Sequence, residues 1–175
     1  MTANTLLSEE EFLNLPEFEG RQELMDGELI ELPPPKDSHN IMALHFLYLL
    51  WEAVGKSRVR MEAAYRLRPR RWLIPDVSVN WPDQRVEDDW LQGAPMLAVE
   101  IASRGNTPEQ LHKKVLAYLE DGAAEAWIVY PKTRTMMVYR ADGTVLLVAA
   151  GADYVCALLG VTITPADHTP HQHEK

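Results

Sequence analysis

Two acidic residues stand inside apolar segments of the chain, and they constrain its fold more than any other feature. Glu100 interrupts the run Leu97–Ala102, and Asp76 follows Pro75 in the segment 72–80. Such apolar segments are typical of buried strands, and Asp and Glu are seldom fully buried without a partner. The fold must therefore bring a cationic partner or a metal ion to these two carboxylates.

Taken singly, each of these acids also has a purely structural interpretation. Asp76 is placed to cap a bend after Pro75, and Glu100 is placed to form an ion pair with a core lysine or arginine. Two carboxylates on two neighbouring strands favour a functional site instead. Hard divalent cations bind through oxygen, and the main-chain carbonyl of Ile101 offers a third oxygen beside the acids. The pattern predicts a site for Mg²⁺ or Mn²⁺ that activates water against a phosphodiester bond.

One lysine on the following helix is placed to join this site. Lys113 and Lys114 are adjacent, so their side chains project about 100° apart. Lys114 lies one turn before Tyr118 and beside the apolar stripe of the helix, whereas Lys113 is expected to face solvent. Without the two carboxylates, a surface position for both lysines is the simpler interpretation. With them, we expect Lys114 to stabilise negative charge that develops during cleavage.

The periodicity of apolar residues predicts an order of elements along the chain. The expected elements are a short helix from Glu9, a hairpin at 22–32 that turns at Asp26–Gly27, a helix at 39–54 capped by Ser38, strands at 59–67, 72–80 and 95–103, a helix from Thr107 to Gly122, a strand at 127–130, and strands at 136–140 and 145–148. Residues 82–93 are expected to form an acidic loop. This order predicts an α/β fold, with a mixed central sheet flanked by helices and with added N- and C-terminal hairpins.

Length and composition indicate a single domain without membrane segments. At 175 residues and 46% hydrophobic content, we expect one domain at 1–165 and a polar tail at 166–175. The single Cys156 excludes an intrachain disulfide framework and a cysteine-based zinc site. No apolar run reaches the roughly 20 residues that span a bilayer, and the N-terminus lacks the basic region of a signal peptide. We therefore expect a cytoplasmic protein.

The charge of the chain is acidic overall but unevenly distributed. A net charge of −9 counts against simple electrostatic binding of nucleic acid. Six arginines nevertheless lie close together, namely Arg58, Arg60, Arg66, Arg68, Arg70 and Arg71. This run forms either a basic face that contacts nucleic acid or a solvated edge strand, and the sequence leaves both interpretations open.

Short motifs with a consistent order and spacing run along nearly the whole chain. They are Ser8–Leu13, Glu23–Glu28, His39, Pro75–Val77, Val99–Ile101, Lys114 with Tyr118, Ala126–Val129 and Gly160. Together they resemble the Uma-type restriction endonucleases, a bacterial branch of the PD-(D/E)XK nuclease superfamily. The chain departs from that pattern in places: Ala102 stands where the superfamily usually has its lysine, residues 102–105 read Ala-Ser-Arg-Gly where the family usually has a Leu-Ser-Pro-Ser run, and Gln110 and Tyr130 stand where the family usually has aspartate.

The resemblance implies a restriction-endonuclease-like core and a particular set of site residues. It implies Asp76 and Glu100 as ligands of Mg²⁺ or Mn²⁺. It implies that Lys114, on the helix, replaces the strand lysine that is Ala102 here. Glu23 is implied as an additional metal ligand or as an acid that positions water, with a surface residue of the hairpin as the alternative.

We therefore predict a metal-dependent DNA endonuclease with Asp76, Glu100 and Lys114 as its catalytic residues. Enzymes that cut both DNA strands often work as dimers, and the nearly all-apolar helix at 39–54 is expected to help build a homodimer. Two alternatives stay open. One is a catalytically degenerate module that keeps the fold and binds nucleic acid or a protein partner. The other is a structural protein whose carboxylates pair with core arginines.

Overall fold

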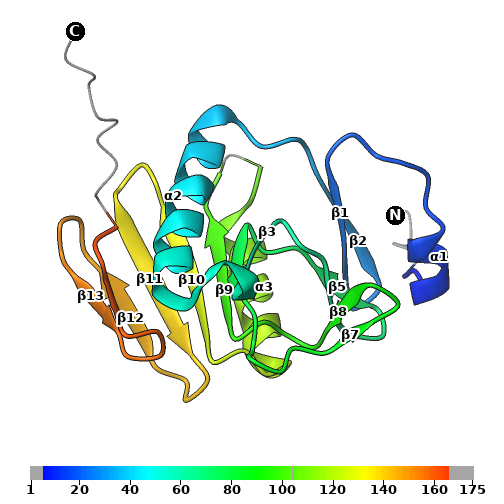
Figure 1. Ribbon diagram of the computed structural model, residues 1–175. Coiled ribbons are helices and arrows are strands. Elements are labelled where there is room, and N and C mark those ends of the chain that lie inside the picture. The colour runs from blue at the N-terminus through cyan, green and yellow to red at the C-terminus, as the bar shows by residue number, and fades with distance from the viewer. Residues whose placement is uncertain (1–5, 104, 166–175) are drawn as a thin grey trace, which may run out of the picture.

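Two six-stranded sheets make up most of the computed structural model, which describes residues 6–103 and 105–165 (Figure 1). The first sheet has the order β2-β1-β5-β4-β8-β7, formed by Glu28–Leu32, Arg21–Met25, Arg71–Leu73, Tyr65–Arg68, Trp90–Gln92 and Val86–Glu87. The second has the order β12-β11-β10-β9-β6-β3, formed by Val145–Val148, Thr135–Arg140, Glu125–Tyr130, Leu97–Ile101, Val77–Val79 and Val59–Met61. A small hairpin, β13 (Tyr154–Cys156) with β14 (Val161–Ile163), follows.

The predicted mixed α/β fold is confirmed, but two sheets replace the single central sheet that we expected. The expected strand at 59–67 is divided between the sheets, and its chain direction changes at Glu62, whose φ is 50°. The expected strand at 72–80 is divided in the same way into β5 and β6. Pro75 lies between them and has no N–H with which to continue a ladder. Asp76 therefore lies at the junction of the two sheets rather than within a strand.

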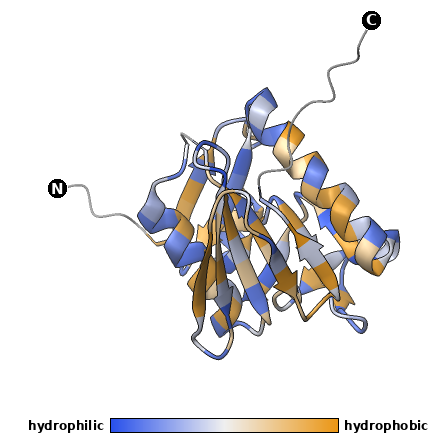
Figure 2. Ribbon diagram, turned by 90° about the vertical axis from the view of Figure 1, so that its left-hand side faces the viewer, coloured by the Kyte–Doolittle hydropathy of each residue, from blue (hydrophilic) through white to orange (hydrophobic). Residues whose placement is uncertain are grey.

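Alternation along the central strands divides the core into two layers. Val99 and Ile101 of β9 belong to the apolar cluster that includes helix α2 (Asp37–Val54), whereas Ala98 belongs to the cluster that includes helix α3 (Pro108–Glu120). Side chains two residues apart share a face, so Glu100 lies with Ala98 on the α3 side. Figure 2 shows how hydrophobic residues concentrate on the strands and along the longest helix.

The ends of the helices agree only in part with the sequence-based expectations. Ser8 with Glu11 and Thr107 with Gln110 form the capping boxes expected for α1 (Glu9–Leu13) and α3. The prediction that Ser38 caps the long helix is wrong, because α2 begins at Asp37 and its first turn has no side-chain cap. The expected loop at 82–93 is also wrong in part, since it contains the short hairpin of β7 and β8.

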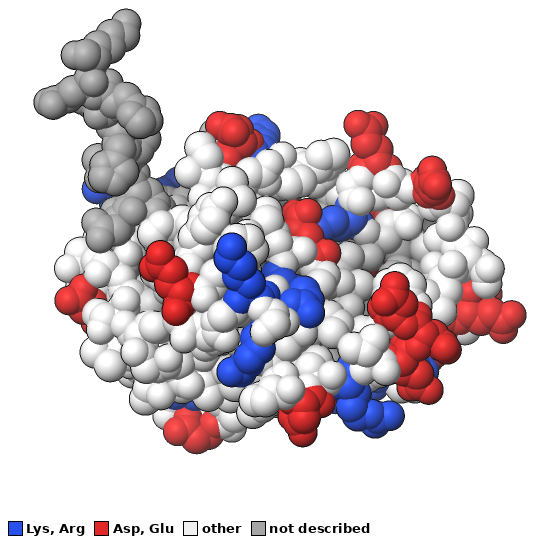
Figure 3. All heavy atoms as spheres, in the orientation of Figure 1, with Lys and Arg blue, Asp and Glu red and all other residues white. Residues whose placement is uncertain are grey.

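Much of the arginine run is neutralised by acidic residues rather than free to form a basic face. The ion pairs join Arg66 to Glu9, Arg68 to Asp121, and Arg71 to Asp26, Glu120 and Asp121. Arg58 and Arg60 instead donate to main-chain carbonyls. Arg58 ends the short 3₁₀ helix η1 (Lys56–Arg58), and Arg60 lies in β3. Figure 3 shows basic side chains in the middle of this face and acidic side chains around its outline.

No helix that the structure describes is long and apolar enough to cross a membrane.

Candidate functional site

Two carboxylates from different strands contact one buried lysine, and a third buried carboxylate belongs to the same cluster. Lys114 of α3 places its Nζ 2.9 Å from Glu23 Oε1 and 2.7 Å from Glu100 Oε1. Glu23 comes from β1 and Glu100 from β9, and Asp76 lies at the start of β6. All four side chains are at most 3% exposed. The sequence-predicted residues are therefore gathered in one place, and Glu23 is a buried member of the cluster rather than a surface residue of its hairpin.

The sheet register explains why Asp76 and Glu100 are neighbours. β6 and β9 are antiparallel, with Val77 opposite Val99, so one further step places Asp76 opposite Glu100. Asp76 Oδ2 accepts the main-chain N–H of Ile101 at 2.7 Å, which ties the junction of the two sheets to the end of β9. Because the chain bends at Pro75, the Asp76 side chain reaches the end of β9 and takes the place of a main-chain hydrogen-bond partner there.

Two basic side chains, Arg21 and His39, hold Asp76 in its ionised form. Arg21 Nη1 donates to Asp76 Oδ1 at 2.7 Å, and His39 Nε2 lies 3.1 Å from Asp76 Oδ2. Burial raises the pKa of Asp76, but the hydrogen bond from His39 and the charge of Arg21 outweigh it and bring the pKa to about 2. For His39, burial lowers the pKa, whereas the bond to Asp76 raises it, and the net shift is upward. Asp76 is therefore a permanent anion at neutral pH.

The pKa of Glu100 is shifted in the opposite direction from that of Asp76. Burial raises its pKa most; Lys114 lowers it, while Asp76 and Glu23 raise it further, and the resulting pKa is about 7. Tyr118 donates its hydroxyl to Glu100 Oε1 at 2.9 Å, one helical turn beyond Lys114. The side chain is thus fixed in position while its proton is exchangeable near neutral pH. The cluster has more carboxylate than its lysine can neutralise.

The donor set suits a hard divalent cation, although no finished metal cage is in place. Among the residues described, no three His, Cys, Asp or Glu side chains are grouped so as to hold an ion. Mg²⁺ commonly uses only one or two carboxylates and completes its shell with water and substrate phosphates. Glu23 Oε2 is buried without a hydrogen-bond partner, which leaves one carboxylate oxygen uncompensated. An unpaired oxygen and a high pKa at Glu100 both indicate room for added positive charge.

Two members of the site were missed in the sequence. Arg21 begins the hairpin strand β1, and its partner Asp76 is 55 residues away, so no local pattern announces the contact. His39 was noted only as one of the family-like motifs at the start of the long helix. In the structure His39 is 5% exposed and contacts Asp76. The one sequence feature that could have indicated this role is the position of a histidine at the start of the helix. Both residues also line a pocket of about 440 Å³.

Comparisons with known proteins find one matching family and a solved structure with a similar fold. The family described as "Uma2: Putative restriction endonuclease" matches residues 9–159. A crystal structure from Anabaena variabilis ATCC 29413, described as "a putative nuclease belonging to DUF820", is similar in fold, with a TM-score of 0.80. The two sequences are 22% identical, and the match covers 91% of this chain and 95% of that one. No curated protein matches the chain.

Proposed function

The chain belongs to the Uma2 family, and from this membership we propose that it is a metal-dependent endonuclease that hydrolyses phosphodiester bonds in DNA. The family and the nuclease-like fold support a nuclease function. The observation that carries the proposal is the burial of three carboxylates together at the junction of two sheets, two of them on Lys114 and one on Arg21. Burying so many charged groups is costly, and a purely structural role would be served as well by apolar side chains.

In this proposal Asp76 and Glu100 hold Mg²⁺ or Mn²⁺, with Glu23 as a further ligand or an acid that positions water. When bound, the cation polarises a phosphoryl oxygen and lowers the pKa of a bound water. Lys114 keeps its charge, because although burial lowers its pKa, the nearby carboxylates raise it well above the usual value. Its ammonium then stabilises negative charge that develops on the phosphate. Arg21 and His39 fix the orientation of Asp76, and Tyr118 fixes that of Glu100.

Binding of Mn²⁺ tests the metal site before any DNA substrate is known. We expect calorimetry to show binding to the wild type and no binding to Asp76→Ala. Because Glu100 must lose its proton to act as a ligand, affinity should rise by up to about tenfold per pH unit until its pKa of about 7 and then level off. Asp76 stays ionised throughout this range and does not contribute to the slope.

A matched control makes the titration decisive. Lys113→Ala changes an exposed lysine on the same helix, which pairs with Glu109, and should bind Mn²⁺ as the wild type does. If neither the wild type nor this control binds Mn²⁺, the metallonuclease proposal fails. The degenerate nuclease-fold module, in which Arg21 and Lys114 simply neutralise the carboxylates, would then take its place.

We propose that residues 1–165 act as one domain, because the site draws side chains from both sheets.

We also propose that two copies of the chain pair through α2. Three apolar residues follow one stripe of that helix, namely Ile41, Leu44 and Tyr48, and they are 55%, 41% and 58% exposed. Such a stripe costs free energy in water and is suited to an isologous contact. We expect the wild type to elute as a dimer and Tyr48→Glu as a folded monomer in size-exclusion chromatography with light scattering. A monomeric wild type at high concentration would contradict this pairing.

A further inference from the structure

A recessed pocket opens beside the carboxylate cluster. Its wall is formed by the linker 33–36, by residues 102–103 and 105–106 after β9, and by residues 131–132 after β10, with Arg21 and His39 on the side of Asp76. β9 and β10 are parallel, so both of these turns lie at the same edge of the sheet, where ligands commonly bind in α/β folds. Figure 1 shows the start of α2 at this edge as well. The pocket is therefore adjacent to the proposed cleavage centre but is not part of the carboxylate cluster.

The pocket carries uncompensated positive charge. Lys36 and Lys132 line it from two different segments, and both are exposed. Neither lysine has an acidic partner within residues 6–103 and 105–165. The first turn of α2, where Ser38 lines the pocket, has no side-chain cap, and the N–H groups of His39 and Asn40 donate to the carbonyl of Lys36. The N–H groups before them add the positive end of an 18-residue helix, which the Asp37 carboxylate in the same turn offsets in part, so the two lysines supply most of the charge. Charge of this kind suits a phosphate group.

A second observation at the same place also points to a ligand. His39 lines the pocket and is 5% exposed, yet its Nδ1 has no hydrogen-bond partner among the described atoms. A buried polar atom without a partner costs free energy unless something else pairs with it. Arg21, which also lines the pocket, likewise has an unpartnered Nε. Arg21 contacts Asp76 through Nη1 and His39 contacts it through Nε2, so a ligand that pairs with Arg21 Nε or His39 Nδ1 would lie next to the proposed metal site.

We propose that this pocket holds one phosphate with its attached nucleoside from an unpaired nucleic-acid strand, so that the substrate is single-stranded or locally unpaired at the cut. This inference rests on the proposed nuclease function and names its substrate class. The volume of about 440 Å³ suits a small-molecule-sized group. The rings of Pro33, Pro34 and Pro131 give the pocket an apolar wall against which an unstacked base is buried.

The same features disfavour an intact duplex. A base must leave the stack before it can enter a recessed pocket, and this costs least in a strand that is already unpaired. Duplex binding also needs an extended basic surface, whereas Arg66, Arg68 and Arg71 are neutralised by acids and the chain carries a net charge of −9. Lys36, Lys132 and the start of α2 offer enough positive charge for the few phosphates of a short single strand.

Fluorescence anisotropy in metal-free buffer tests the inference without cleavage. The probes are a labelled single strand of about 12 nucleotides and the same strand annealed to its complement. We expect the single strand to bind at least about tenfold more tightly than the duplex. In the double variant Lys36→Glu/Lys132→Glu that affinity should fall at least about tenfold, and the salt slope should drop by about 1.4, the loss of two single-strand phosphate contacts.

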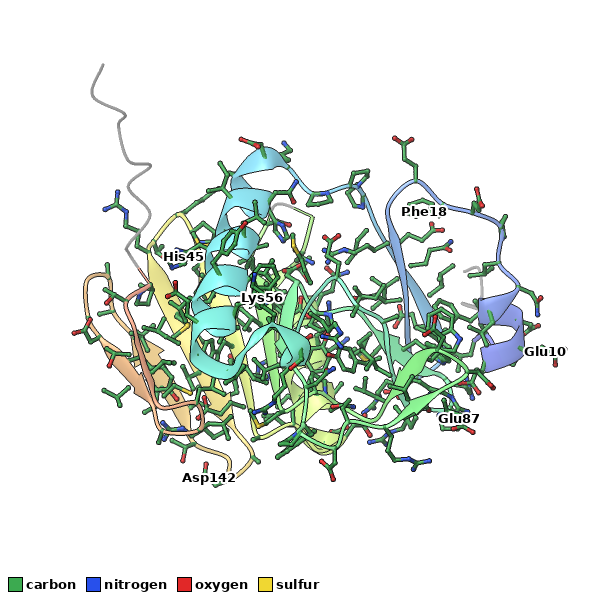
Figure 4. All side chains as sticks on the ribbon, in the orientation of Figure 1. Glu10, Phe18, His45, Lys56, Glu87 and Asp142 are labelled. Atoms are coloured by element: carbon green, nitrogen blue, oxygen red, sulfur yellow. The ribbon has the colours of Figure 1, made fainter. Side chains whose placement is uncertain are left out.

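The matched control reverses two charges elsewhere. Lys56 lies beyond the far end of α2 (Figure 4), and Lys113 lies on α3, so Lys56→Glu/Lys113→Glu has the same net charge but an intact pocket. Equal weakening by both double variants, or tighter binding of the duplex, overturns the inference. Efficient cutting of the duplex in Mn²⁺ overturns it as well but leaves the nuclease proposal standing. If the single strand binds through Lys36 and Lys132 but Mn²⁺ does not bind, the proposed nucleotide-binding role of the pocket is supported and the nuclease proposal fails.

Discussion

Lys114→Met is expected to lower the rate of DNA cleavage by about 10²- to 10³-fold, the usual effect of removing one donor that stabilises transition-state charge. Nζ contacts both Glu23 and Glu100, so the variant also leaves two buried carboxylates without their cation. The free energy of unfolding in metal-free buffer should therefore fall by about 3–5 kcal/mol. Single-turnover cleavage in Mn²⁺ and urea unfolding measure the two effects separately.

The two effects of Lys114 are separable with a second substitution. Adding Glu23→Gln removes one of the unpaired charges and keeps an acceptor for the N–H of Ile74, which Glu23 Oε1 receives at 2.9 Å. We expect this double variant to regain much of the stability and none of the activity. Lys113→Met, next to it but 61% exposed, should change neither. Wild-type cleavage by folded Lys114→Met would rule out the catalytic role of the lysine.

The sequence was sufficient to predict that Glu100 and Lys114 are buried, although the lysine was expected there only because of the two carboxylates. Glu100 is a charge inside an apolar strand, and Lys114 stands beside the apolar stripe of an amphipathic helix. Those local signals translate directly into burial, which the structure confirms for both residues. Helix α3 was equally predictable, since its capping box and its proline at the first helical position lie next to each other in the sequence.

The remaining parts depend on contacts that no local pattern encodes. Period-two alternation predicts that residues 59–67 are extended, but it does not say that they belong to two sheets, a division that follows from the conformation of Glu62. The partners of Asp76 were hidden for a similar reason. Arg21 and His39 are distant in sequence, and their roles appear only when the hairpin and α2 are packed at the end of β9.

Arg21→Met is expected to make the stability of the protein depend on a divalent cation. Arg21 Nη1 lies 2.7 Å from Asp76 Oδ1, and the Arg21 side chain is 14% exposed. Its loss leaves a buried carboxylate with His39 as its one remaining basic side-chain contact among the described residues, which should cost about 3 kcal/mol in metal-free buffer. For a chain of this size that is a fall in Tm of roughly 6–12 °C. Thermal unfolding with EDTA and with Mn²⁺ measures it.

If a cation binds at Asp76, Mn²⁺ should replace the charge that Arg21 supplied. At about 100 times its Kd, Mn²⁺ stabilises the folded state by about 2.7 kcal/mol, which nearly restores the loss. Arg140→Met is the matched control, because Arg140 also pairs with a buried carboxylate, Glu125, far along the chain from the site. In metal-free buffer that variant should also lose stability, but its metal site is intact, so Mn²⁺ should stabilise it by no more than it stabilises the wild type. Arg21→Met should gain more stability from Mn²⁺ than the wild type does, because Asp76 no longer has Arg21 as a competing cation. An equal or smaller gain in Arg21→Met would show that Arg21 does not share Asp76 with the metal, and that Asp76 has a purely structural partner in this arginine.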